Sequence, residues 1–155
     1  MMNTSNTWKS PLADHYSADA KLGSNDQCEI AREFAGVEQE YAAVRNSVAF
    51  ADNCHYGKFR VTGSGALDLM NRVVMADVAR LAIGRATWTF MLREDGSTLC
   101  DVYVVCAGDE YLLFSEGVTP SEVLAVLSAE ASSHMVELTD LTESVALIGI
   151  DGPFS

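Results

Sequence analysis

The chain has 155 residues, of which 48% are hydrophobic and 21% charged, and its formal net charge is −12. This composition is typical of a folded globular protein and excludes a disordered one. The acidic excess argues against binding to nucleic acid, which needs a basic face, and against adsorption to an anionic membrane surface. No stretch is apolar enough to span a bilayer or to serve as the core of a signal peptide, so the expected location is the cytoplasm.

The four cysteines are consistent with that location. Cys28, Cys54, Cys100 and Cys106 form no CxxC pair, so the sequence predicts no zinc site and no other metal centre. Free thiols are the normal state of cysteine in the cytoplasm.

Three elements are predicted in the first half of the chain. A helix is expected over Cys28–Asn46, because apolar residues recur there at spacings of three and four: Ile30, Phe34, Val37, Tyr41 and Val44. Lys58–Thr62 alternates between apolar and polar residues and predicts a half-buried strand. Ala66–Met75 is expected to be a second helix, with Leu67, Met70 and Val74 turned inward.

The second half predicts an antiparallel meander followed by a helix. Thr87–Leu92 and Thr98–Cys106 read as the two strands of a hairpin, with Gly96 in the turn, and Tyr111–Ser115 as the adjacent third strand. A capping box formed by Thr119-Pro120-Ser121-Glu122 predicts a helix that runs to about Ala131.

Two short apolar runs close the chain. Met135–Leu138 and Val145–Ile150 read as strands, and the second has no polar alternation, which is typical of an interior strand with a neighbour on each side. The expected fold class is therefore α+β, an antiparallel sheet with flanking helices, and the chain looks like the front part of something larger.

One carboxylate lies on an otherwise apolar face of the Thr98–Cys106 strand. Alternation puts Asp101 on the same face as Leu99, Tyr103 and Val105, with no cation nearby in sequence. A carboxylate in such surroundings is costly unless it meets a hydrogen-bond donor. The residues alone leave two readings open: Asp101 braces the turn at Arg93–Ser97, or it meets a ligand.

Six short motifs follow one another between Asp52 and Val105. Their order and spacing resemble those of the tetrahydrofolate-dependent aminomethyltransferases, meaning the T-protein of the glycine cleavage system and related folate-dependent demethylases. The motifs are Asp52–Lys58 (DNCHYGK), Val61–Gly63 (VTG), Ala76–Val78 (ADV), Gly84–Trp88 (GRATW), Arg93–Ser97 (REDGS) and Cys100–Val105 (CDVYVV).

The resemblance implies a function and a site. By motif position Asp101 is the catalytic acid, and the residues that bind the folate are Tyr56, Trp88, Asp101, Tyr103 and Val105. The implied cofactor is tetrahydrofolate, and the implied partners are the folate and a small one-carbon donor. A carrier protein and a second copy of the chain are further partners that the sequence leaves open.

The resemblance also implies how the chain is divided. Residues 1–51 would be the N-terminal segment of a first domain, 52–131 a middle α+β domain, and 132–155 the return into the first domain, which is truncated there. Members of the family are well over twice this length, and further residues that hold the folate lie beyond the last residue here.

Departures from the family pattern shape the choice of function. Trp88 stands where the family has Tyr and keeps a stacking plane without the hydroxyl, while Cys100 replaces the first Asp of an Asp-Asp pair. These changes favour a relative with a donor other than that of glycine cleavage. The alternatives are a truncated or degenerate non-catalytic member that acts as a binding or assembly module, and an unrelated α+β domain.

Overall fold

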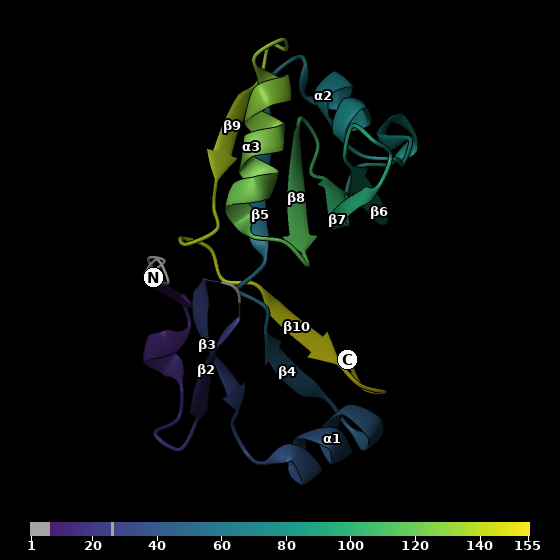
Figure 1. Ribbon diagram of the computed structural model, residues 1–155. Helices are drawn as coiled ribbons and strands as arrows, with labels where there is room; N and C mark the ends of the chain where they lie inside the picture. Colours follow the sequence, from purple (N-terminus) through teal and green to yellow (C-terminus); the bar gives the residue numbers. More distant parts are fainter. Residues whose placement is uncertain (1–6, 26) are drawn as a thin grey trace. The chain divides into compact units, whose positions relative to one another are not determined.

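The computed structural model describes residues 7–25 and 27–155, and the chain divides into two compact units (Figure 1). One unit contains the chain up to His55 together with Glu143–Ser155, and the other contains Tyr56–Thr142. Helices and antiparallel strands occur in both, so the fold is α+β, as the sequence predicts.

The Tyr56–Thr142 unit is built on a five-stranded antiparallel sheet with the order β6-β7-β8-β5-β9. Its strands are β5 (Gly57–Thr62), β6 (Ala86–Leu92), β7 (Thr98–Cys106), β8 (Glu110–Glu116) and β9 (Glu137–Asp140). The three predicted meander strands are confirmed as adjacent, and β9, which the sequence analysis placed in the returning segment, pairs with β5.

Two helices cover one face of this sheet, α2 (Ala66–Val73) and α3 (Pro120–Ala131), and the short turn η2 (Val78–Arg80) follows α2 (Figure 1). The core lies between the helices and the sheet. Its fully buried members include Leu69 and Met70 from α2, Leu127 from α3, and Val102 and Leu113 from the strands. The predicted capping box at the start of α3 is present, with the Glu122 carboxylate accepting hydrogen bonds from the Thr119 N–H and hydroxyl at 3.1 and 2.8 Å.

The other unit contains two small sheets. One has the order β1-β3-β2, from Trp8–Lys9, Cys28–Glu33 and Lys21–Asn25, and the other pairs β4 (Ala49–Asp52) with β10 (Ile148–Asp151). The turn η1 (Ala13–His15) and helix α1 (Val37–Asn46) complete this unit.

The helix predicted over Cys28–Asn46 is wrong in its first half. Residues Cys28–Glu33 form strand β3, and only Val37–Asn46 is helical. Gly36, at φ 95°, separates the two elements in a backbone conformation that favours glycine. The apolar spacing that suggested one helix therefore combines residues from a strand and a helix.

The last strand is also shorter and less covered than predicted. Only Ile148–Asp151 is extended, and within the described chain it pairs with β4 alone. Ile148 and Ile150 are half exposed, at 50% and 53%. Val145–Ile150 is therefore not an interior strand with neighbours on both sides in this structure.

Candidate functional site

Strand β7 separates the core of the Tyr56–Thr142 unit from an outer sheet face. Cys100, Val102 and Val104 are buried in the core under the helices, and Cys106 on the same face is buried as well. Asp101, Tyr103 and Val105 alternate with them and therefore project from the opposite face. The predicted alternation is thus confirmed over residues 100–106, and the described helices of this unit pack on the Cys100 side only. Leu99, which was predicted on the face of Asp101, packs against the core instead, because the β6–β7 register is irregular opposite it.

Pairing with β6 and β8 arranges the outer face in rows. Residues directly opposite one another in antiparallel strands share a face, so the registers define which side chains are neighbours. The row of Asp101 holds Phe90 and Glu116; the next holds Trp88, Tyr103, Phe114 and Lys58; the third holds Ala86, Val105, Leu112 and Arg60.

Aromatic rings dominate the middle of this face. Trp88 lies opposite Tyr103, and the two side chains are 51% and 47% exposed. The Trp88 and Phe90 rings meet edge to face, with centroids 4.6 Å apart. Flat, half-exposed rings of this kind offer a stacking surface to a planar ligand.

Tyr56 directly precedes β5 and lies at the edge of the row that contains Asp101 and Glu116. Its hydroxyl hydrogen-bonds to Glu116, and burial, that bond and the nearby charges of Glu116 and Asp101 raise its pKa. The hydroxyl is therefore protonated at neutral pH. All five residues predicted for the site lie on this face or at its edge.

Asp101 itself is half-buried and, among the described residues, has neither a hydrogen bond nor an ion pair. The β6–β7 turn is held instead by Asp95, whose carboxylate accepts hydrogen bonds from the Ser97 N–H and hydroxyl, and by the Arg93 N–H to the Ser97 carbonyl at 2.8 Å. The interpretation that Asp101 braces the turn therefore finds no contact to support it. Behind Asp101, burial raises the pKa of the Cys100 thiol to about 11, which keeps that thiol neutral and inert.

Phe90 and Glu116 are the site residues that sequence reasoning missed. Both become neighbours of Asp101 only through the register of β6 and β8 with β7. Two cations lie farther along the same face. Lys58 is 1% exposed and its Nζ donates to the Tyr56 carbonyl at 3.1 Å, while the Nε of Arg60 is buried and has no hydrogen-bond partner among the described residues.

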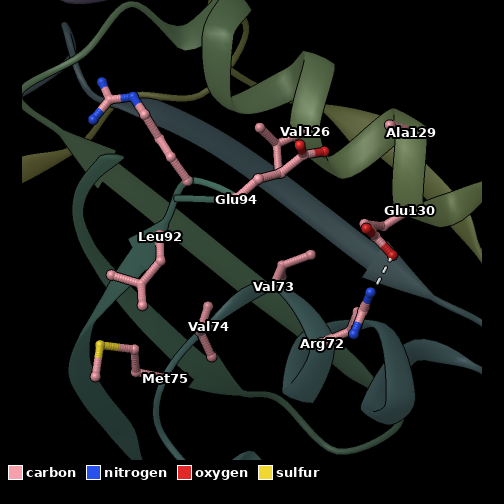
Figure 2. A pocket seen from close by; sticks show the side chains of 10 residues that line it. Arg72, Val73, Val74, Met75, Leu92, Glu94, Val126, Ala129 and Glu130 are labelled. Atoms are coloured by element: carbon pink, nitrogen blue, oxygen red, sulfur yellow. Dashed lines mark hydrogen bonds and ion pairs between the residues drawn. The ribbon is translucent and has the colours of Figure 1, made fainter. Parts of the chain in front are cut away.

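Two cavities of this unit differ in their relation to Asp101. A shallow one of about 450 Å³ is lined by Asp101 and Glu116 together with Thr98, Leu99, Cys100 and Gly117. A second, of about 510 Å³, lies between α2, α3 and the end of the β6–β7 hairpin (Figure 2). Figure 2 shows the ion pair of Arg72 and Glu130, 3.4 Å apart, at the side of this groove, and none of the predicted site residues lines it.

A separate polar cluster lies in the other unit around Asp52. Its carboxylate accepts hydrogen bonds from the Ser10 hydroxyl at 2.6 Å, from the Cys54 N–H at 2.8 Å and from the Tyr16 hydroxyl. Burial raises the pKa of Asp52, but the hydrogen bonds from Cys54, Ser10 and Tyr16 outweigh it and hold the pKa below its usual value. This cluster ties the N-terminal segment to β4.

Two kinds of feature are absent from the described part of the chain. No group of three or more His, Cys, Asp or Glu side chains is placed there to hold a metal ion. No helix in residues 7–25 and 27–155 is long and apolar enough to cross a bilayer.

The fold matches that of a solved enzyme. A crystal structure of the glycine cleavage system aminomethyltransferase T from Bartonella henselae superposes with a TM-score of 0.85 at 22% identity, over 94% of this chain and 41% of that one. At that identity the match establishes the fold class alone.

Sequence comparisons establish the family. The family model "GCVT N-terminal domain" matches residues 10–155. Aminomethyltransferases from Deinococcus deserti and Thermus thermophilus are each 31% identical over 147 residues, covering 94% of this chain and 41% and 42% of theirs. The enzyme from Geobacillus kaustophilus is 32% identical over 147 residues, covering 94% of this chain and 40% of its own. The chain belongs to the GCVT N-terminal domain family, and it spans about two fifths of the length of these relatives.

Proposed function

We propose that the protein is a tetrahydrofolate-dependent one-carbon transferase in which Asp101 is the catalytic acid. Membership in the GCVT N-terminal domain family and similarity to named aminomethyltransferases support the reaction class. Because the chain spans about two fifths of those relatives, the proposal concerns the protein in its full native length.

The position of Asp101 is the observation that carries the proposal. Its carboxylate lies on the outer face of the sheet, in the row of Phe90 and Glu116, and makes no hydrogen bond or ion pair within the described residues. An acceptor kept without a partner next to exposed aromatic rings is suited to a ligand that brings hydrogen-bond donors.

The residues on this face fit tetrahydrofolate. Trp88 and Tyr103 offer half-exposed aromatic planes on which a flat pterin ring can stack, and Tyr56 and Val105 flank them. When bound, tetrahydrofolate supplies the nitrogen that accepts the one-carbon group. Asp101 would accept a hydrogen bond from a ring N–H or deliver a proton to a folate nitrogen.

The proposal extends to the one-carbon donor and to the cellular compartment of the protein. The donor is a small molecule that carries a methyl or methylene group on nitrogen, sulfur or oxygen, and a carrier protein is a further candidate for presenting it. We assign the protein to the cytoplasm because all four cysteines are free and buried.

The test measures tetrahydrofolate binding and one-carbon transfer with the protein in its full native length. Asp101→Asn keeps the size of the side chain but removes the ionisable acid, so transfer is expected to fall ~10²–10⁴-fold. Cys100→Ser, which changes the adjacent residue on the core face, should leave transfer nearly intact. If the wild type binds no tetrahydrofolate and transfers nothing, the non-catalytic alternative of a binding or assembly module holds instead.

A further inference from the structure

Lys58 on β5 is a buried lysine on the sheet face that carries the proposed folate site. Its side chain is 1% exposed, and the strand registers place it in the row of Phe114, Tyr103 and Trp88. Moving an ammonium group out of water costs free energy, so burial alone favours an apolar side chain at this position. The stability of the sheet therefore does not by itself account for a lysine here.

The backbone of Lys58 is fixed by the turn that follows β9. Its N–H donates to the Thr142 hydroxyl at 3.1 Å, and its carbonyl accepts a hydrogen bond from the Leu141 N–H at 2.8 Å. Thr142 is 4% exposed, and its own N–H donates to the Asp140 carboxylate at 2.8 Å. The side chain of Lys58 thus extends from a firmly held point.

From this point the side chain of Lys58 reaches back to Tyr56, where its Nζ donates to the backbone carbonyl at 3.1 Å. Tyr56 directly precedes β5, whose pairing with β8 begins at Gly57 and whose pairing with β9 begins at Phe59. The strand ladders therefore do not extend to Tyr56. The bond from Lys58 fixes the peptide group that joins Tyr56 to the sheet.

The other end of Tyr56 lies at the proposed site. Its hydroxyl hydrogen-bonds to Glu116, which is directly opposite Asp101 on the outer face. The bond from Lys58 to the carbonyl and the bond between the hydroxyl and Glu116 together hold both ends of this residue. Because Lys58 is 1% exposed, it offers no surface of its own to a ligand.

We propose that Lys58 is a positioning residue for tetrahydrofolate binding, whose ammonium group holds Tyr56 in the orientation in which the phenol ring contacts the folate. This inference rests on the proposed function and adds to it a residue that does not touch the ligand. Since Lys58 acts through Tyr56, its effect on the affinity should require the phenol ring.

The experiment is a double-mutant cycle. Calorimetry measures tetrahydrofolate binding to the protein in its full native length, as wild type, as Lys58→Met, as Tyr56→Leu and with both changes, and a melting curve is recorded for each. Lys58→Met keeps a long side chain but removes the ammonium donor, and Tyr56→Leu removes the phenol ring. Thr142→Val perturbs the same link at its other end, because it removes the hydroxyl that accepts the Lys58 N–H. Arg72→Met is the matched control, since it replaces a cation with methionine at a groove of the same unit that no predicted site residue lines.

Lys58→Met is expected to weaken tetrahydrofolate binding by about threefold or more when Tyr56 is present, and by less than about 1.5-fold in the Tyr56→Leu protein. Thr142→Val should show the same dependence on Tyr56, and it decides the question if Lys58→Met does not fold. Arg72→Met should leave the affinity unchanged. Equal effects of Lys58→Met with and without the phenol ring, or no effect in either case, would overturn the inference, while intact binding by the wild type keeps the proposed function. A wild type that binds no tetrahydrofolate would overturn both.

Discussion

Asp95 and Ser97 close the β6–β7 turn through two hydrogen bonds to one carboxylate oxygen, from the Ser97 N–H at 2.9 Å and from its hydroxyl at 2.7 Å. These bonds, the side-chain one first, hold the pKa of Asp95 below its usual value. The hairpin thus has its own carboxylate at the turn. Asp101, which lies opposite Phe90 in the same hairpin, is left for another role.

The first prediction separates these two carboxylates. Asp95→Ala removes the acceptor for both Ser97 donors, so the melting temperature should fall measurably while one-carbon transfer stays within twofold of wild type. Asp101→Asn should show the reverse profile, with unchanged melting and a large loss of transfer. Thermal melting and transfer assays on both variants test this prediction. A loss of transfer in Asp95→Ala at unchanged melting temperature would indicate that Asp95, and not Asp101, is the catalytic carboxylate.

The second prediction concerns the ring of Trp88. Trp88→Leu keeps an apolar side chain of moderate size but removes the stacking plane, so the affinity for tetrahydrofolate should fall between about twofold and tenfold, the range of an aromatic contact. Trp8→Leu makes the same substitution in the other unit and should leave that affinity unchanged. Calorimetric titration of both variants measures the effect, and equal affinities would remove Trp88 from the binding face.

The hairpin could be predicted from sequence because its signals are local. Alternating residues define both strands, Gly96 at φ 84° supplies the turn, and the predicted bounds of Thr98–Cys106 are those of β7. The same alternation placed Asp101, Tyr103 and Val105 on one face. Each of these inferences needs only residues close together in the chain.

The rest of the site depends on register, which a single sequence does not specify. Phe90 and Glu116 are neighbours of Asp101 because β6 and β8 pair with β7 at particular positions, and a shift by one residue would turn both side chains to the core. The helix prediction in the N-terminal unit was wrong for a related reason. Ile30 is buried on β3 whereas Tyr41 is exposed on α1, and their helical spacing is a coincidence of two elements.

The third prediction is a pH dependence that arises from Asp52. Its pKa is depressed in the folded state, so its hydrogen bonds contribute stability that is complete above the pKa of an unfolded aspartate, about 3.9. That contribution is lost as the pH falls through the lower, folded-state value. Asp52→Asn should therefore melt below the wild type at pH 6, and the difference should shrink below about pH 4.

Melting curves between pH 6 and pH 2 measure this dependence. Asp14→Asn, at an exposed position in η1, serves as the control and should run parallel to the wild type. Tyr16→Phe removes one donor to Asp52 and brings the folded-state pKa nearer to the unfolded value, so its acid-induced loss of stability should be smaller and should end at a higher pH than in the wild type. A constant difference between Asp52→Asn and wild type at all pH values would show that Asp52 does not titrate in this range.

The last prediction concerns exposed apolar side chains in the N-terminal unit. Helix α1 has no buried residue, Tyr41 on it is 64% exposed, and Phe50 on β4 is 69% exposed. The 155-residue chain is therefore expected to self-associate at micromolar concentration through this surface. Burying a large apolar side chain contributes about 1.5–3 kcal/mol, so Phe50→Ser should weaken association about tenfold or more. Met135→Ser, which replaces an apolar residue 77% exposed in the other unit, should leave association unchanged. Sedimentation velocity over a concentration series measures this association. A monomer at every concentration would contradict the prediction and show that Phe50 stays exposed to solvent.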